Sequence, residues 1–161
     1  MKILLITTSY NGLCQRIHDE LLLLEHNVSI EFAISNRHMN EAVRLFEPEL
    51  IICPFLKQKI PKSIWEKYKC IIIHPGIIGD RGPSSLDWAI EEEQKYWGVT
   101  ALQAQEEMDA GDIWSNFNFS MRESFKASIY RKEVTTAAVK ALHEILENIH
   151  NSNFVPQPLD Y

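Results

Sequence analysis

Residues 70–83 carry the sequence CIIIHPGIIGDRGP, in which an unbroken apolar run ends at His74 and is followed by proline and glycine. A short continuous apolar run bounded by turn residues is typical of a strand that is buried on both faces. Residues 50–53, LIIC, form a second run of this kind. Such strands lie in the middle of a parallel sheet that has helices on both sides. The two runs therefore predict an α/β protein.

The segments on either side of these runs alternate between strand and helix patterns. The predicted strands are residues 3–6, 28–33, 50–53, 70–73, 99–104 and 113–119; the predicted helices are residues 12–25, 40–46, 63–67, 87–93 and 134–149. We expect Pro83 and Ser84 to open the helix at 87–93. Strands that alternate with helices predict an open, mostly parallel twisted sheet with helices on both faces, a Rossmann-like layer.

Length and composition indicate one globular domain. The chain has 161 residues, of which 45% are hydrophobic and 24% are charged, which is enough apolar material for a core. We assign residues 1–150 to an α/β domain. Residues 151–161 are polar and contain two prolines, so we expect a linker or docking tail, an arrangement compatible with further domains in a longer protein.

Charge and cysteine usage exclude several classes of protein. The net charge is −6 and the basic residues are dispersed, so we predict no nucleic-acid partner. The three cysteines lack CxxC spacing and the histidines lack metal-ligand spacing, which predicts reduced structural thiols and no metal. The apolar start at residues 1–6 is too short for a signal sequence or a membrane span. We expect a soluble, cytoplasmic protein that does not enter a membrane.

Four loops follow predicted strands, at residues 9–12, 54–61, 74–83 and 105–111. In open α/β sheets, ligands collect beyond the carboxyl ends of the strands. The first loop has a single glycine and lacks the G-x-G-x-x-G pattern, which disfavours a dinucleotide site. We interpret Asn11 in this loop as the cap of the first helix.

The third and fourth loops carry the candidate chemistry. His74 emerges from a buried strand, which suits a general acid or base, although a structural histidine bonded to a nearby carbonyl fits the same pattern. Asp109 follows the next strand, so a His74–Asp109 pair is predicted. We interpret Glu106 and Glu107 as a solvated turn. For the sequence Asp80-Arg81, a local ion pair and an Arg81 contact to an anionic ligand are both open.

The motifs HPGIIGDRGPSSLDWAI, WGVT and MDAGDIW, between His74 and Trp114, together resemble the signature of the formyl-tetrahydrofolate-dependent formyltransferases. That family includes the glycinamide-ribonucleotide and methionyl-tRNA formyltransferases. The resemblance implies that His74 and Asp109 are catalytic and that Ile72 occupies the position of the family's catalytic asparagine. It also implies a folate pocket formed by Phe55, Leu56, Lys57, Gly76, Ile77, Ile78, Gln105, Glu106, Met108 and Asp109.

Within the family, the sequence of residues 74–90 is similar to that of the N-terminal domain of hydrogenase-maturation proteins. This implies that formyl-tetrahydrofolate is the formyl donor and coenzyme A the acceptor, in the synthesis of the carbon monoxide ligand of [NiFe]-hydrogenase. It also implies two partners, a crotonase-like C-terminal domain and the hydrogenase-maturation machinery. The alternatives are a formyltransferase that acts on a small amine such as an amino sugar, and a folate- or partner-binding module without catalysis.

Ile72 is the main departure from the family pattern. Its side chain cannot donate a hydrogen bond to the formyl oxygen, and loss of one such donor costs on the order of a hundredfold in rate. We therefore expect either that another donor acts in its place, for instance protonated His74 or a backbone N–H of the Gly76 loop, or that the acceptor needs less help.

Overall fold

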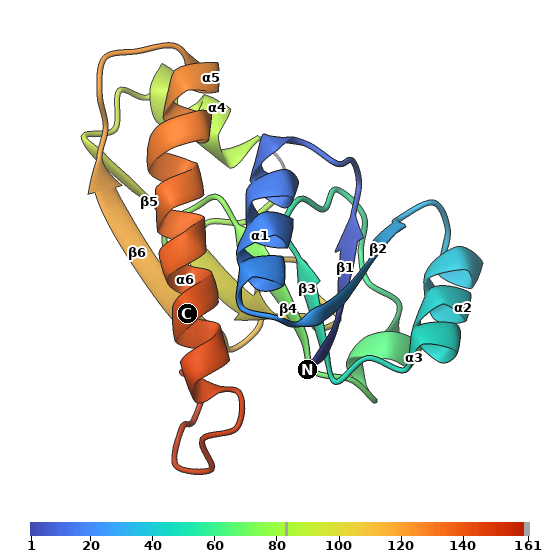
Figure 1. The fold of residues 1–161 in the computed structure, drawn as a ribbon. Helices are drawn as coiled ribbons and strands as arrows, with labels where there is room; N and C mark the ends of the chain where they lie inside the picture. The colour runs from blue at the N-terminus through green and yellow to red at the C-terminus, as the bar shows by residue number, and fades with distance from the viewer. Residues whose placement is uncertain (83, 160–161) are drawn as a thin grey trace.

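The structure is a computed structural model that describes residues 1–82 and 84–159, so the predicted role of Pro83 lies outside the described residues. One sheet of six strands forms its centre (Figure 1). The strands are β1 (Lys2–Thr7), β2 (Asn27–Phe32), β3 (Leu50–Cys53), β4 (Cys70–His74), β5 (Tyr96–Gln103) and β6 (Ile113–Ser120). The helical elements are α1 (Gly12–Leu23), α2 (Asn36–Phe46), α3 (Lys62–Trp65), α4 (Ser85–Glu91), α5 (Lys126–Ile129), the π-helical turn η1 (Tyr130–Val134) and α6 (Thr135–Asn148).

The strand order is β2-β1-β3-β4-β5-β6, and the first four strands are parallel. The predicted α/β class and mostly parallel sheet are confirmed. However, β5 runs antiparallel to β4, and β6 runs antiparallel to β5, which we did not expect. The connection from β4 to β5 contains the seven-residue helix α4, and β5 starts near the edge where β4 ends. Helix length alone does not set this direction, because the parallel strands β3 and β4 are joined through the four-residue helix α3.

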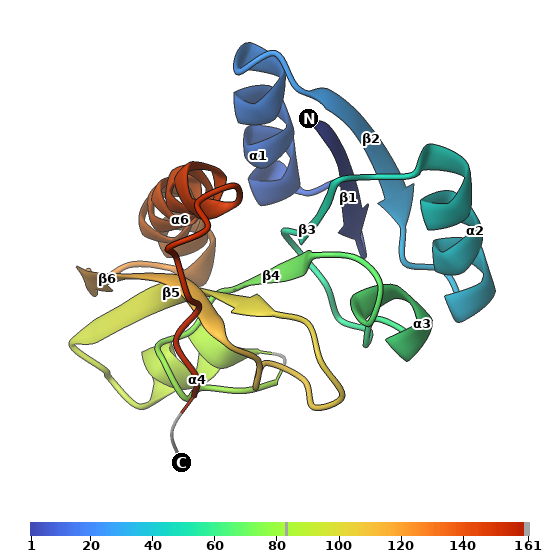
Figure 2. The same ribbon diagram turned by 90° about the horizontal axis from the view of Figure 1, so that it is seen from below.

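Helices cover both faces of the sheet, as Figure 2 shows: α1 and α6 lie on one side, and α2 and α3 on the other. Alternate residues of β1 serve the two layers. Ile3 and Leu5 pack with the α1 and α6 residues, whereas Leu4 and Ile6 pack with those of α2 and α3. This two-sided burial explains the unbroken apolar runs in the sequence.

Two side-chain caps define helix starts. Asn11 accepts a hydrogen bond from the Cys14 backbone N–H at 2.9 Å, which confirms its predicted role as the cap of α1. Ser35 accepts one from the His38 N–H at 3.1 Å, so α2 begins at Asn36, four residues before the predicted start. Ser84 has a left-handed backbone before α4, and its side chain makes no capping bond.

The last helix is longer than predicted and changes its winding. Before α6 lie the short helix α5 and the π-helical turn η1, and the helical winding is continuous from Lys126 to Asn148. The Thr135 hydroxyl donates to the Tyr130 carbonyl at 2.8 Å within this turn. Turns of this type are rare and are often found at functional sites.

The three cysteines are buried free thiols. Burial raises the pKa of Cys14. The contact between the Cys53 and Cys70 sulfurs, 3.9 Å apart, raises the pKa of Cys53, and burial adds to this. Cys14 and Cys53 therefore stay protonated at neutral pH, and all three buried side chains act as packing groups.

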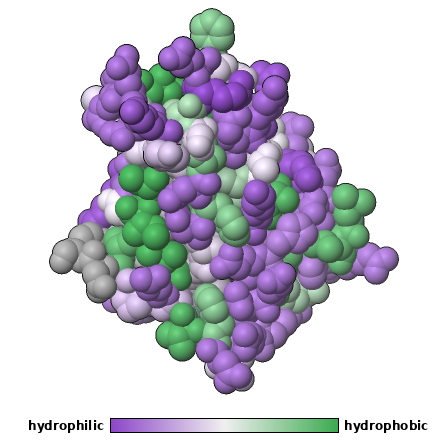
Figure 3. Space-filling view, turned by 90° about the vertical axis from the view of Figure 1, so that its left-hand side faces the viewer, coloured by the Kyte–Doolittle hydropathy of each residue, from purple (hydrophilic) through white to green (hydrophobic). Residues whose placement is uncertain are grey.

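The segment after α6 returns to the sheet. Gln157 exchanges two backbone hydrogen bonds with Ile113 at the start of β6, at 2.7 and 2.9 Å, and the Phe154 ring packs on Trp114. One face of the molecule is largely hydrophilic, with its apolar side chains in small groups (Figure 3). Among the described residues, no helix has the length and apolar character that a membrane crossing requires.

Candidate functional site

The site is centred on His74, the last residue of β4, whose side chain is only 4% exposed. Its Nε2 atom lies 2.8 Å from the Asp80 carboxylate, in a hydrogen bond. Its Nδ1 atom lies 3.4 Å from the Asp109 carboxylate, in a longer ion-pair contact. Both ring nitrogens therefore face a carboxylate, an arrangement that suits an imidazolium, in which both nitrogens are donors.

Asp109 reaches His74 by a different route from the one expected. Because β5 is antiparallel to β4, its end lies beside the start of β4, where the Ala104 N–H donates to the Cys70 carbonyl. The following loop must then run along β4 for four residues, about 13 Å, before Asp109 meets His74. The two residues meet as predicted, but the assumption that the 105–111 loop begins at the carboxyl edge of the sheet is wrong.

Close backbone packing holds this loop in place. A Cβ atom on Gly111 would lie 1.7 Å from the Gln103 carbonyl oxygen, so only glycine fits there. Asp109 has a left-handed backbone, with φ of 54°, and its carboxylate accepts a hydrogen bond from the Gly82 N–H at 2.9 Å. Its side chain is 6% exposed. The loop thus fixes a buried carboxylate at the cost of some backbone strain.

Asp80 was not predicted as a partner of His74. Gly79, with φ of 93°, precedes it, and the Asp80 N–H donates to the Ile77 carbonyl at 3.0 Å, so the tight turn aims its carboxylate back at the ring. Arg81 donates to Glu107 at 3.1 Å. A Cβ atom on Gly76 would lie 2.5 Å from His74 Nε2 and 2.6 Å from Asp80 Oδ2. The His74–Asp80 contact therefore requires glycine at position 76.

Hydrogen bonds from β5 anchor the backbone that follows His74. The Thr100 hydroxyl donates to the Gly76 carbonyl at 2.8 Å, and the Trp97 indole donates to the Pro75 carbonyl at 2.9 Å. The Gly76 N–H donates to the His74 carbonyl at 2.9 Å. This N–H, one of the donors we expected to act on a formyl oxygen, is thus already used.

His74 lines a cavity of about 270 Å³ between the loops after β3 and β4. The cavity wall brings together most of the predicted site residues: Phe55, Leu56, Lys57, Ile72, His74, Met108 and Asp109. Residues that sequence reasoning missed also line it, among them Ser84, Ser85, Lys126 and Tyr130. Ser85 belongs to the motif HPGIIGDRGPSSLDWAI, which was the only sequence signal for it. Its approach to His74 depends on how the chain turns between the two residues.

Other predicted pocket residues lie outside this wall. Gly76 packs against His74 without lining the cavity, while Ile77 and Ile78 line a separate open groove with Tyr96 and Asn118. Gln105 is turned toward its own loop, where its amide donates to the Ala110 carbonyl at 2.7 Å, and Glu106 is exposed. In both loops these residues lie in a part of the chain that turns away from the cavity, while later residues of the same loops, Gly82 and Met108, line it.

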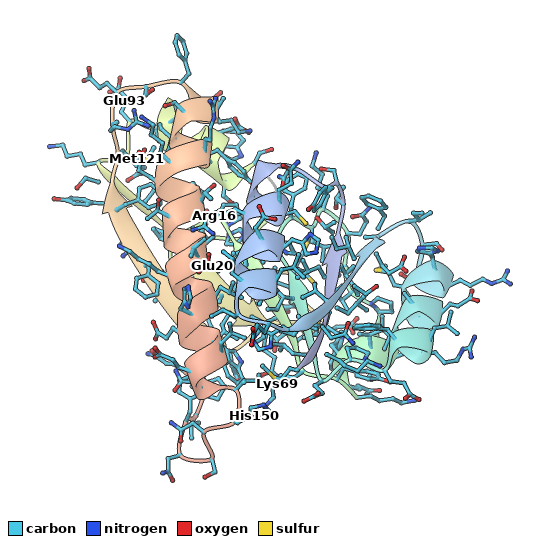
Figure 4. All side chains as sticks on the ribbon, viewed as in Figure 1. Arg16, Glu20, Lys69, Glu93, Met121 and His150 are labelled. Carbon is cyan, nitrogen blue, oxygen red and sulfur yellow. The ribbon has the colours of Figure 1, made fainter. Side chains whose placement is uncertain are left out.

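A second cavity of about 680 Å³ adjoins the first and shares Phe55, Lys126 and Tyr130 with it. Arg16 and Arg131 add two cationic groups to its wall. Arg16 pairs with Glu20 on the side of α1 that faces α6 (Figure 4). Arg131 is exposed and makes no hydrogen bond or ion pair with residues 1–82 or 84–159.

Tyr130 stands between the two cavities. Its hydroxyl accepts a hydrogen bond from the Asn11 amide at 3.3 Å, which joins the π-helical turn to the start of α1. Burial raises the pKa of Tyr130, so its hydroxyl remains protonated at neutral pH. Within the described parts of the chain, no three His, Cys, Asp or Glu side chains form a group that could hold a metal ion.

Known proteins resemble this chain in sequence and in structure. The sequence profile of the formyl transferase family matches residues 31–146, which include β4, the His74 loop and both flanking carboxylates. This chain belongs to the formyl transferase family. The hydrogenase maturation factor HoxX of Bradyrhizobium diazoefficiens is 48% identical over 159 residues, which are 99% of this chain and 28% of HoxX.

Solved structures agree with the family assignment. HypX from Aquifex aeolicus in complex with tetrahydrofolic acid matches 99% of the chain with a TM-score of 0.97 and 50% identity, over 28% of the length of HypX. Methionyl-tRNA formyltransferase from Clostridium thermocellum shares the fold alone, with a TM-score of 0.77 and 24% identity over the whole chain and 69% of that protein. The chain thus spans little more than a quarter of HoxX and HypX.

Proposed function

We propose that the chain binds formyl-tetrahydrofolate in the His74 cavity and transfers its formyl group to the thiol of coenzyme A. The observation that carries this proposal is the placement of His74, between two carboxylates, in the wall of a largely apolar cavity. The cavity is slightly smaller than pockets that enclose a whole small ligand, about 300–1,000 Å³. It therefore suits the pterin end and formyl group of the folate, with the remainder extending toward the opening. The HypX complex with tetrahydrofolic acid supports the choice of ligand.

The reaction is an acyl transfer. The thiol sulfur attacks the formyl carbon, a tetrahedral oxyanion forms, and the bond from that carbon to the folate nitrogen breaks. The thiol proton passes to the departing nitrogen, so that tetrahydrofolate and formyl-coenzyme A are the products. His74 holds or relays this proton, and the carboxylates of Asp109 and Asp80 orient the ring and balance its positive charge.

The second cavity suits the acceptor. Coenzyme A carries phosphate groups, and Arg16, Lys126 and Arg131 supply cations along a surface that continues into the first cavity. Arg16 is paired with Glu20 and Lys126 with Asp87 at 2.8 Å, so a phosphate would have to share these two cations with carboxylates. An acceptor that lies there could extend its thiol past Tyr130 toward His74. An amine acceptor without phosphates would make no use of these three cations, so the arrangement favours the thioester route.

We place this activity within a longer protein. The relatives HoxX and HypX are more than three times as long as the chain, and HoxX is named a hydrogenase maturation factor. A crotonase-like domain that consumes formyl-coenzyme A, working with other hydrogenase-maturation proteins, is the partner that this proposal requires. The segment at residues 151–159, which is docked on β6, would guide the chain toward such a domain.

The test uses formyl-tetrahydrofolate and coenzyme A with the full-length protein. Calorimetry should show saturable binding of tetrahydrofolate, and mixing both substrates should release tetrahydrofolate and form a thioester. Glucosamine in place of coenzyme A should give no product. Absence of any folate binding would refute the proposal, whereas binding without turnover would reduce the chain to a folate-binding module.

A further inference from the structure

The His74 cavity must supply a hydrogen-bond donor to the oxyanion of the tetrahedral intermediate, because unassisted charge development in an apolar cavity is costly. Ile72, on the wall, has no donor. Two backbone N–H groups near His74 are already used: that of Gly76 donates to the His74 carbonyl, and that of Gly82 donates to Asp109. The imidazole nitrogens both face carboxylates. The donor must therefore come from elsewhere in the wall.

Ser85 meets this requirement. Its side chain lines the cavity and is 3% exposed, and its Oγ atom lies 3.5 Å from His74 Nε2. No other hydroxyl among the described side chains lies within hydrogen-bonding distance of the ring. Tyr130 also lines the cavity, but its hydroxyl is held near Asn11 at the border with the second cavity.

The present partner of Ser85 leaves its hydroxyl able to turn. Oγ donates to the Gly82 carbonyl at 3.0 Å, across the turn that precedes α4. A serine hydroxyl rotates freely about its C–O bond and carries one donor, so it can exchange this carbonyl for a more negative acceptor. A hydrogen bond to a charged oxygen is roughly twice as strong as one to a neutral carbonyl.

We infer that Ser85 is a catalytic residue of formyl transfer, whose hydroxyl donates a hydrogen bond to the formyl oxygen as negative charge develops on it. Ser85 forms no covalent bond; the bond changes remain those between the thiol, the formyl carbon and the folate nitrogen. The inference rests on the proposed function, since it assigns the oxyanion donor of that same site.

The experiment measures tetrahydrofolate release and tetrahydrofolate affinity in the full-length protein. Ser85→Ala should slow release on the order of a hundredfold while the Kd for tetrahydrofolate stays nearly unchanged. Ser85→Cys, which keeps the shape but donates weakly, should show a similar loss, and Ser85→Thr, which keeps the hydroxyl, should retain most of the rate. The cysteine variant also decides the matter if Ser85→Ala does not fold.

A second-site test separates chemistry from packing. Ile72→Asn places an amide donor on the same cavity wall. If the missing group is an oxyanion donor, adding Ile72→Asn to Ser85→Ala should raise the rate of tetrahydrofolate release at least tenfold above that of Ser85→Ala alone. A role limited to anchoring the Gly82 carbonyl predicts the reverse: Ser85→Ala would weaken tetrahydrofolate binding and the asparagine would restore nothing. That result, or full activity in Ser85→Ala, overturns the inference. If the wild type binds folate but releases no tetrahydrofolate, the proposed function itself fails and Ser85 has no catalytic role.

Discussion

The two loops that flank His74 each deliver one carboxylate to its ring, but they are built differently. The loop at residues 104–112 follows β5, carries a buried Asp109 with a strained backbone, and is fixed by the contact of Gly111 with the Gln103 carbonyl. The loop at residues 75–84 carries Asp80, which is 23% exposed, and turns at Gly79 and Gly82, where a Cβ atom would meet open space. The first loop is held by close packing at Gly111, whereas the second turns at Gly79 and Gly82 and is packed where Gly76 meets His74.

The shorter contact is made by the more exposed carboxylate. Asp80 lies 2.8 Å from the ring and Asp109 lies 3.4 Å from it. Water screens a partly exposed charge, whereas a buried one acts at full strength and has few alternative partners. We therefore expect Asp109 to contribute more to the orientation and charge of His74, despite the longer distance.

The largest effect should come from removing the centre that both loops serve. His74→Ala should lower the rate of formyl loss from the folate by roughly 10²–10⁴-fold, the usual contribution of a positioned acid or base. His74 ends its strand but is 4% exposed and faces two carboxylates, so we expect some loss of stability without loss of the fold. Turnover assays with a thermal melt as control check this. An unchanged rate would make His74 a structural residue.

Gly111→Ala tests the packed loop. The new methyl group would overlap the Gln103 backbone, so we expect a loss of about 3 kcal/mol in the free energy of unfolding. Gly79→Ala is the matched control in the other loop. It meets open space and pays only for its positive φ, about 1–2 kcal/mol. Urea unfolding measures both variants, and equal losses would contradict the proposed difference between the loops.

Asp109→Asn should lower turnover about a hundredfold, because the amide keeps the size of the side chain but removes the buried charge that faces Nδ1. The hydrogen bond from the Gly82 N–H can be kept by the amide oxygen, so the Kd for tetrahydrofolate should change little. Steady-state kinetics and calorimetry distinguish the two quantities.

Asp80→Asn should cost about tenfold, since its charge is screened by solvent. A loss equal to that of Asp109→Asn would show that distance outweighs burial at this site. The double variant would then report whether the two carboxylates act on His74 independently, in which case the two losses multiply.

Ile72→Val should have the smallest effect. It removes one methylene from a partly buried apolar side chain and changes no polarity, so we expect less than about 1 kcal/mol in stability and an unchanged rate. A large change in turnover would show that the cavity wall opposite the two loops is shaped more tightly than its composition suggests.

Periodicity in the sequence was sufficient to predict the elements of the fold but not the direction of the last two strands. The apolar patterns of β5 and β6 are the same whichever way the strands run. The length of α4 does not distinguish the cases either, because the four-residue helix α3 joins the parallel strands β3 and β4. The helical segment at residues 126–133, before the predicted helix at 134–149, was also missed, since nothing in the sequence pattern there marks a π-helical turn.

The candidate site could be predicted where residue type alone was informative. His74 and Asp109 were found because histidine and aspartate after strands are typical of acid–base sites, and the family motif pointed to the same residues. Asp80 and Ser85 were missed because their approach to His74 depends on the turns at Gly76, Gly79 and Gly82. Ile77 and Ile78 were placed in the pocket only by the family resemblance, and in the structure they line a separate groove.

The π-helical turn at Tyr130–Val134 gives the last helix two angular phases. One additional residue in a helix rotates everything before it by about 100° relative to everything after it. After the turn, Ala138 and Ala141 of α6 pack in the core against the sheet. At or before the turn, Tyr130 and Lys126 line the cavities. Gain or loss of a single residue in this turn would therefore re-aim Lys126 and Tyr130, and it would also move Ile129, which is 1% exposed, out of the core.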